Sequence, residues 1–381
     1  NTSPAAYAGV ISGLTGSLFK IGTGKLTPLP GIQYDGVSGV EGIGTPTSIA
    51  VSPDGKYAYV ASGEDIYGRI TGGYNAVAVF KRDDTTGALS FVEAKFNGTG
   101  DVVGLLNANA VTVSPDGLHV YVTSGRNVKA GGSSNSDNAI TVFQRDSTTG
   151  RLTFVEAKFH VLGQIDGLKD LQDVQVSPDG KHVYTAGLGG IVVFNRDATT
   201  GALSPKEVKE SVLGFGSHTS LTISPDGANI YVTAIPELSV GSVFVFSRDL
   251  TDGTLTLTET FREDVDHIGI GGAMDATITP DGAGVYVAAS NGDNLGGVVF
   301  FSRDAGVQGK LSFKGKLSQV GTGIPLLNAT AIATSPDGNN VYAVALNANS
   351  VVQFNTKPIV DSGSGQASCD GTMASPFIPC D

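Results

Sequence analysis

Residues 114–122 read Ser-Pro-Asp-Gly-Leu-His-Val-Tyr-Val, and close copies of this stretch divide the chain into repeating units. Proline presets φ for the first corner of a turn, aspartate bonds to nearby backbone, and glycine accepts a positive φ, so Pro-Asp-Gly predicts a tight turn. The β-branched and aromatic residues that follow favour a strand. The six copies of the turn begin at Ser52, Ser114, Ser177, Ser224, Thr279 and Ser335.

A second motif follows in five of these units. It is an apolar run ending in Phe, then Arg-Asp, Gly and Leu, as in residues 142–152, and it predicts a third strand, a corner and a fourth strand. We interpret the five Arg-Asp pairs as structural parts of this corner. A tyrosine also stands six residues after each proline, and a seventh lies in a similar apolar run near the N-terminus. The tyrosines are Tyr7, Tyr59, Tyr121, Tyr184, Tyr231, Tyr286 and Tyr342.

Four-stranded units that recur every 47 to 63 residues predict an all-β chain folded as a β-propeller. The seven tyrosines predict seven blades of four antiparallel strands, in a single domain over residues 1–381. We expect the chain termini to close the ring. In this scheme the tail at residues 366–381 supplies the inner strand that the N-terminal unit lacks, and a disordered tail is the alternative.

The overall charge argues against some classes of partner. With a net charge of −12, binding to a nucleic-acid backbone or an acidic membrane is disfavoured, whereas cations and basic partners fit better. No apolar run approaches the roughly 18 residues of a transmembrane helix, so no transmembrane segment is expected.

The two ends of the chain bear on its location. The chain begins at Asn1 without an initiator Met, which indicates removal of a targeting segment. Cys369 and Cys380 lie close together in sequence and predict a disulfide, with two free thiols as the alternative. We therefore expect a secreted, extracellular or periplasmic protein, with association with the cell surface as a further option. Glycosylation sequons begin at Asn1, Asn97 and Asn328.

The Ser-Pro-Asp-Gly turns, Val-Tyr-Val strands and Arg-Asp-x-Thr-Thr-Gly-x-Leu corners resemble those of the YVTN-repeat, lactonase-like propellers. That family includes bacterial 6-phosphogluconolactonase and fungal carboxymuconate cyclase. The resemblance runs from about Tyr7 to Phe354 and implies a seven-bladed propeller with lactone-directed chemistry. The family's enzymes resemble one another in a Pro-His-x-His stretch entering an inner strand. In the corresponding segments of this chain, only His218 supplies a histidine.

Candidate site residues lie where the inner strands begin. Because strands alternate in direction, the tight turns share one face and the longer, dissimilar loops share the other, which we call the loop face. Asp170, Asp173, His218 and Asp275 are expected to converge near the channel mouth on that face. These groups would suit a hard cation such as Ca²⁺, and a water-filled channel is the alternative; no cofactor is expected to be required. His218 with Asp173 or Asp275 would also suit general-base catalysis.

Two other histidines receive a structural interpretation. His119 and His182 share a repeat position with Tyr57 and Asn229, which indicates a tolerant surface position.

The functional hypothesis is a binding or assembly module that meets a protein partner, or a second copy of itself, through the loop face. The alternative is a lactonase-type hydrolase or cycloisomerase acting on a sugar-acid or muconate-like lactone.

Overall fold

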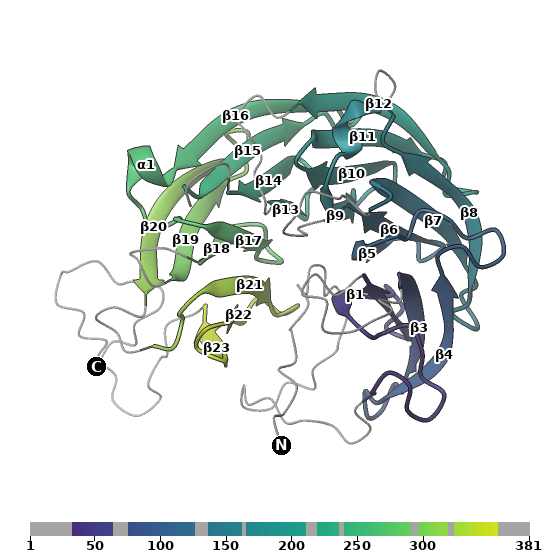
Figure 1. The fold of residues 1–381 in the computed structure, drawn as a ribbon. Coiled ribbons are helices and arrows are strands. Elements are labelled where there is room, and N and C mark those ends of the chain that lie inside the picture. The colour runs from purple at the N-terminus through teal and green to yellow at the C-terminus, as the bar shows by residue number, and fades with distance from the viewer. Residues whose placement is uncertain are drawn as a thin grey trace, which may run out of the picture.

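The computed structural model describes residues 33–63, 75–125, 136–161, 165–210, 219–235, 240–290, 296–318 and 324–356. These residues form six antiparallel sheets arranged around a common centre as the blades of a propeller (Figure 1). Five sheets have four strands and the last has three. In every sheet the first strand lies innermost, and these inner strands contact one another in succession from the first sheet to the last.

The first three blades follow one another along the chain. Their strands are β1 (Pro46–Val51), β2 (Tyr57–Ser62), β3 (Ala76–Arg82) and β4 (Leu89–Phe96) in blade 1; β5 (Ala108–Val113), β6 (His119–Ser124), β7 (Ala139–Arg145) and β8 (Leu152–Phe159) in blade 2; and β9 (Leu171–Val176), β10 (His182–Gly187), β11 (Gly190–Arg196) and β12 (Leu203–Glu210) in blade 3. A short 3₁₀ helix, η1 (Asp166–Leu168), precedes β9.

The remaining blades continue the order. Their strands are β13 (Thr219–Ile223), β14 (Asn229–Ala234), β15 (Ser242–Arg248) and β16 (Leu255–Arg262) in blade 4; β17 (Ala273–Ile278), β18 (Gly284–Ala289), β19 (Gly297–Asp304) and β20 (Lys310–Ser318) in blade 5; and β21 (Ala329–Thr334), β22 (Asn340–Ala345) and β23 (Ser350–Asn355) in blade 6. One turn of helix, α1 (Glu263–Asp266), follows β16.

The predicted number of blades is wrong: the described residues form six blades, not seven. The count of seven rested on tyrosines alone and gave Tyr7 a blade of its own. Each of the six sheets instead carries one Pro-Asp-Gly turn between its first two strands, and the segment around Tyr7 has none. A Pro-Asp-Gly turn specifies a hairpin directly, so the number of these turns counts the blades better than the number of tyrosines.

Some of the predictions concern residues outside the described part of the chain. These are Tyr7, His218, Cys369, Cys380 and the tail at residues 366–381.

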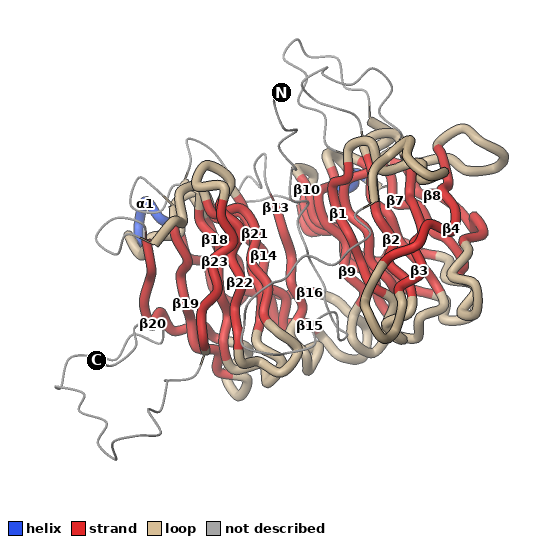
Figure 2. The backbone as a smooth tube through the Cα atoms, turned by 90° about the horizontal axis from the view of Figure 1, so that it is seen from below, coloured by secondary structure: helices blue, strands red, loops and turns tan. Residues whose placement is uncertain are grey.

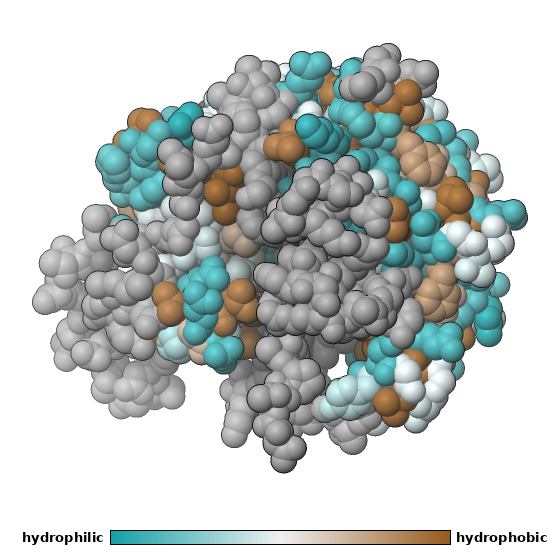
Figure 3. Space-filling view, in the orientation of Figure 1, coloured by the Kyte–Doolittle hydropathy of each residue, from teal (hydrophilic) through white to brown (hydrophobic). Residues whose placement is uncertain are grey.

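The strands run between two faces, with loops at both ends (Figure 2). Bonds between the Pro-Asp-Gly turns and the Arg-Asp corners confirm that both kinds of turn share one face, which we call the turn face. Side chains from neighbouring blades form joint hydrophobic clusters; Tyr59 of blade 1, for example, packs in one cluster with Val111 and Phe143 of blade 2. The core therefore lies between blades. Figure 3 views the molecule from the same side as Figure 1, and the described surface in this view is largely hydrophilic, with hydrophobic side chains in scattered spots.

An arginine joins each of blades 2 to 5 to the blade before it. Arg145 of blade 2 donates from Nε to Tyr59 Oη at 2.7 Å and from Nη2 to Asp54 Oδ2 at 2.8 Å, both in blade 1. Its Nη1 holds the turn of its own blade through Gly117 O at 2.8 Å. Tyr59 Oη in turn donates to Gly150 O of blade 2 at 3.0 Å. We call this set of bonds the arginine clamp.

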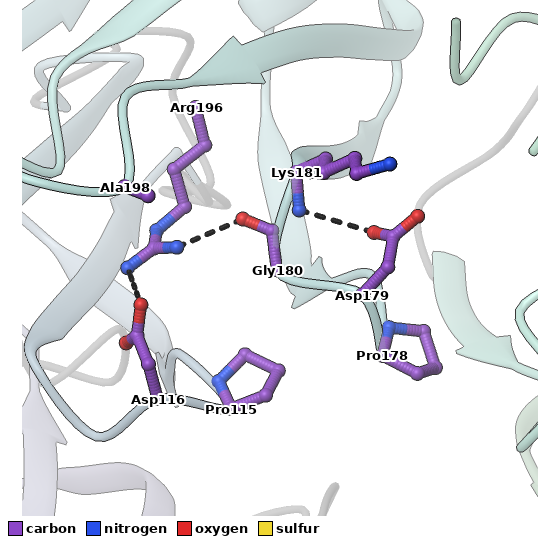
Figure 4. Close-up of a pocket in the computed structure, with 8 residues that line it drawn as sticks. All are labelled: Pro115, Asp116, Pro178, Asp179, Gly180, Lys181, Arg196 and Ala198. Carbon is purple, nitrogen blue, oxygen red and sulfur yellow. Dashed lines mark hydrogen bonds and ion pairs between the residues drawn. The ribbon is translucent and has the colours of Figure 1, made fainter. Parts of the chain in front are cut away.

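The clamp recurs around the ring, and Figure 4 shows the Arg196 copy. The side chains of its arginines are 1–2% exposed. Burial opposes ionisation of Asp179, yet the bonds from Ser177 and Arg248 lower its pKa to about 2, so this carboxylate stays charged beside its arginine. The clamps are Arg145–Asp54, Arg196–Asp116, Arg248–Asp179 and Arg303–Asp226. The Arg-Asp pairs are confirmed as structural, but their arginines reach across to the preceding blade.

Each buried guanidinium also meets an uncharged partner. Arg145 lies 5.3 Å from the centroid of the Tyr57 ring, and Arg303 Nη2 donates to Asn229 Oδ1 at 2.6 Å. At the same repeat position His119 and His182 are buried, so their interpretation as surface residues is wrong. Their Nδ1 atoms lie 2.8 and 2.9 Å from an arginine Nη2. Arginine only donates, so each imidazole must accept, and is therefore neutral.

A second set of links joins the outer strands. A glutamate in the fourth strand of one blade accepts the backbone N–H of a leucine at the first or second position of the fourth strand of the next blade. The pairs are Glu93 with Leu152 (2.7 Å), Glu156 with Leu203 (2.7 Å), Glu207 with Leu255 (2.9 Å) and Glu259 with Leu311 (3.0 Å). Blades are thus tied at mid-radius and at the rim.

The arginine clamp predicts a large stability difference between two arginines. Arg196→Met would leave Tyr121, Asp116 and the Gly180 carbonyl without their donor, and we expect it to lower the free energy of unfolding by about 3 kcal/mol. Arg151→Met removes an ion pair whose arginine is 58% exposed, and should cost less than about 1 kcal/mol. Urea unfolding measures both; equal losses would show that the clamp does not hold the blades.

The neutral histidines predict a pH dependence of stability. Burial, and then the charge of the neighbouring arginine, lower the pKa of His119 and His182 below the ordinary 6.5. As pH falls below 6.5, the unfolded chain takes up protons that the folded chain resists, so stability is lost toward acid. Asn229 shows that an amide can replace the imidazole without titrating. The double variant His119→Asn, His182→Asn should therefore lose less stability than the parent between pH 7 and pH 5. A parallel pH dependence in chain and variant would contradict neutral, clamped histidines.

Candidate functional site

The six inner strands surround the centre of the propeller, where the sequence predicts a channel. Their partly exposed polar residues carry hydroxyl or amide groups: Thr47, Asn109, Thr112, Gln172, Gln175, Thr222, Thr277, Thr330 and Thr334. Within these six strands as described, the residues of charged type are Asp173 and Asp275, and both are buried. We call them the carboxyl pair.

A break in strand pairing recurs in five of the six inner strands as described, and in two of them it places a member of the pair. The register shifts between Leu171 and Asp173 where β9 pairs with β10, and between Ala273 and Asp275 where β17 pairs with β18. Such bulges redirect a side chain, and here both carboxyls point between inner strands. Asp173 Oδ2 accepts Leu221 N–H of the next blade at 2.9 Å, and Asp275 Oδ2 accepts Ile332 N–H at 3.0 Å.

Ser220 joins the pair. Its Oγ lies 3.0 Å from Asp173 Oδ2 and 2.9 Å from Asp275 Oδ1, so one hydroxyl links carboxyls that come from two other blades. The exposed fractions are 4% for Asp173, 6% for Ser220 and 1% for Asp275. All three residues of the cluster are therefore buried between the inner strands.

Burial changes the acidity of both carboxyls. It raises the pKa of Asp173 to about 7, against the bond from Leu221 N–H, and the charge of Asp275 raises it further. Burial also raises the pKa of Asp275, to about 6, although the bonds from Ile332 N–H and Ser220 lower it. Two carboxyls that titrate near neutrality form a combination suited to proton transfer.

The structure thus brings together two of the four residues singled out from sequence. Asp170 lies before β9 in a left-handed conformation (φ 48°), and its backbone N–H donates to Asn138 Oδ1 at 2.8 Å. His218 lies outside the described residues, so its pairing with either carboxyl stays a prediction. Sequence reasoning missed Ser220. Aligning the repeats at four residues before each turn would have shown a serine there between two aspartates in successive blades.

The bonding of the pair favours a proton over a metal ion as its occupant. Both oxygens of each carboxyl accept backbone N–H groups, whose positive ends repel a cation. Among the described residues, no three His, Cys, Asp or Glu side chains are grouped to hold a metal ion. The expected Ca²⁺ site stays a prediction.

A surface depression elsewhere belongs to the arginine clamp. It measures about 350 Å³ and lies on the turn face, lined by residues that include Pro115, Pro178 and Lys181 (Figure 4). Its Arg196 is bonded to Asp116 and to Gly180 O, and Asp179 accepts Lys181 N–H. Because these groups satisfy one another, the carboxyl pair is the stronger candidate.

Comparisons with solved structures establish the fold. A putative 6-phosphogluconolactonase from Bacteroides uniformis is similar with a TM-score of 0.59 and 19% identity, over 81% of this chain and 80% of that chain. A periplasmic gluconolactonase from Pseudomonas aeruginosa is similar with a TM-score of 0.58 and 22% identity, over 81% and 80% of the two chains. At these identities the likeness concerns architecture. No match was found among curated protein sequences.

A match to a protein-family model relates this chain to known proteins by sequence. The model described as "Lactonase, 7-bladed beta-propeller" matches residues 17–161 and 75–212, which together span more than half of the chain. The family description gives seven blades, whereas the described residues of this chain form six. The repeat motifs, the propeller and this match agree: the chain belongs to the lactonase family of β-propellers.

Proposed function

We propose that this chain hydrolyses a lactone of a sugar acid in its central channel, entered from the loop face. The observation that carries the proposal is the carboxyl pair, two proton-exchanging groups joined by one hydroxyl between the inner strands of a lactonase-family propeller. The substrate class is inferred from similar structures named as 6-phosphogluconolactonase and gluconolactonase. The comparisons favour this alternative over the binding-module hypothesis, for which the described residues offer no support.

The chemistry requires two proton transfers. Water attacks the lactone carbonyl carbon and gives a proton to a base, and the ring oxygen takes a proton from an acid as its bond to that carbon breaks. One ionised and one protonated carboxyl meet both needs, and raised pKa values near 6 and 7 allow both states at neutral pH. The hydroxyl and amide groups of the inner strands suit the hydroxyl groups of a sugar acid.

A location outside the cytoplasm forms part of the proposal. One similar structure is a periplasmic protein. Over the described part of the chain, no helix is long and apolar enough to span a membrane. The Cys369–Cys380 disulfide lies outside the described residues and stays a prediction.

Hydrolysis can be tested with glucono-δ-lactone and the full chain, with the spontaneous rate subtracted. Asp173→Asn and Asp275→Asn keep the side-chain shape but remove one proton site each, and each should lower kcat/KM about 10²-fold. Ser48→Ala is the matched control, because Ser48 occupies the Ser220 position in blade 1 and accepts only Val111 N–H, at 3.3 Å. It should leave the rate unchanged.

Two results would contradict the proposed hydrolysis. One is a rate for the parent chain that equals the spontaneous rate over a panel of sugar-acid lactones. The other is full activity in both aspartate variants, with unfolding curves confirming that they are folded.

A further inference from the structure

If both carboxyls were ionised, the two contacts of Ser220 Oγ with them could not both be hydrogen bonds. A serine hydroxyl has one hydrogen, and Ser220 Oγ lies within hydrogen-bond distance of two carboxyl oxygens, at 3.0 Å and 2.9 Å. It can donate to only one of them. The other contact would then set two oxygen lone pairs against each other in a buried place.

The backbone around the pair cannot supply the missing hydrogen. Asp173 Oδ2 already accepts Leu221 N–H, and Asp275 Oδ1 accepts Ala276 N–H at 2.9 Å. Both amide hydrogens point at carboxyl oxygens, not at Ser220 Oγ. A proton on one carboxyl completes the set, because that carboxyl then donates to Oγ while Oγ donates to the other.

We propose that Asp173, Ser220 and Asp275 form a hydrogen-bonded chain that holds one carboxyl proton, and that Ser220 passes protons between the two aspartates. One carboxyl holds the proton and donates to Ser220 Oγ, and Ser220 donates to the other, ionised carboxyl. The count of one proton is independent of the proposed lactone hydrolysis; the relay role rests on it.

The relay gives a balanced cycle for hydrolysis. When the proton is on Asp173, attacking water gives a proton to Ser220 Oγ while the serine hydrogen moves to Asp275, and Asp173 gives its proton to the departing ring oxygen. Asp275 is then protonated and Asp173 ionised. Passing a proton back through Ser220 restores the resting state. The net change is lactone plus water to hydroxy acid.

In the described structure, the hydrogen-bonded chain of Asp173, Ser220 and Asp275 contacts uncharged groups. The titratable groups on the second strands of the same blades are His182, Tyr184, Tyr231 and Tyr286. His182 and Tyr184 bond to the Arg248 clamp, Tyr231 bonds to Gly309 O, and Tyr286 stacks on Phe300. The pair itself meets the backbone of Val174, Leu221, Ala276 and Ile332. His218 lies outside the described residues.

The repeats provide an internal comparison. At the position of Ser220 the other blades carry Ser48, Ala110, Asp173, Asp275 and Ala331. Ser48 accepts a single backbone N–H from the next blade, so serine at this position has a purely structural role in blade 1. In the described residues, only blade 4 sets a serine between two carboxyls.

The test of the shared proton is infrared spectroscopy of the full chain at pH 7, which detects the C=O stretch of a protonated, buried carboxyl. The parent should show one such band. Either Asp173→Asn or Asp275→Asn should abolish it, because the remaining carboxylate then takes the single hydrogen of Ser220. A parent without the band, or either variant that keeps it, would overturn the shared proton, whatever the lactone assay shows.

The relay is tested by activity in parallel. Ser220→Ala should lower kcat about tenfold, Ser220→Thr should restore most of it by returning the hydroxyl, and Ser48→Ala should have no effect. Full activity in Ser220→Ala would overturn the relay. If the infrared pattern holds while no lactone is hydrolysed, the shared proton stands and the proposed function fails.

Discussion

The arginine that leaves the third strand of one blade and bonds to the blade before it is the interaction on which the propeller depends. A buried guanidinium needs several acceptors, and here it takes a tyrosine hydroxyl and a carboxylate from the neighbouring blade and a turn carbonyl from its own. This explains why Ser-Pro-Asp-Gly, the tyrosine and Arg-Asp recur together along the chain. They are the parts of one interblade bond, and losing any part leaves the others without partners.

The clamp also separates structure from function in space. It gathers its bonds at the turn face, where four of the repeats make nearly the same contacts. The inner strands are then free to differ near the other end of each blade. Bulges in β9 and β17 aim two carboxyls between inner strands, and a serine from β13 joins them. A rigid, repetitive frame therefore carries one irregular, proton-holding cluster.

Local chemistry was readable from sequence, and contacts between distant residues were not. The Pro-Asp-Gly turns, the strands and the two faces followed from turn preferences and alternation. The blade count failed because a tyrosine in an apolar run is weaker than a turn motif as the sign of a blade. His119 and His182 were misplaced because their burial comes from an arginine about 65 to 80 residues later in the chain. Asp173 and Asp275 were found as polar residues at inner strands. Ser220 could not be found in this way, because its role depends on contacts with residues of two other blades.

The dependence of kcat/KM on pH tests the central claim, that a carboxyl pair sharing one proton drives lactone hydrolysis. The pair must hold one proton to act as both acid and base, and its apparent pKa values belong to the pair as a whole. The account predicts a bell-shaped profile with its maximum between about pH 6 and pH 7, falling toward acid as a second proton binds and toward alkali as the shared proton is lost. A rate that is flat from pH 5 to pH 8 after subtraction of spontaneous hydrolysis, or one that rises steadily with pH, would contradict it.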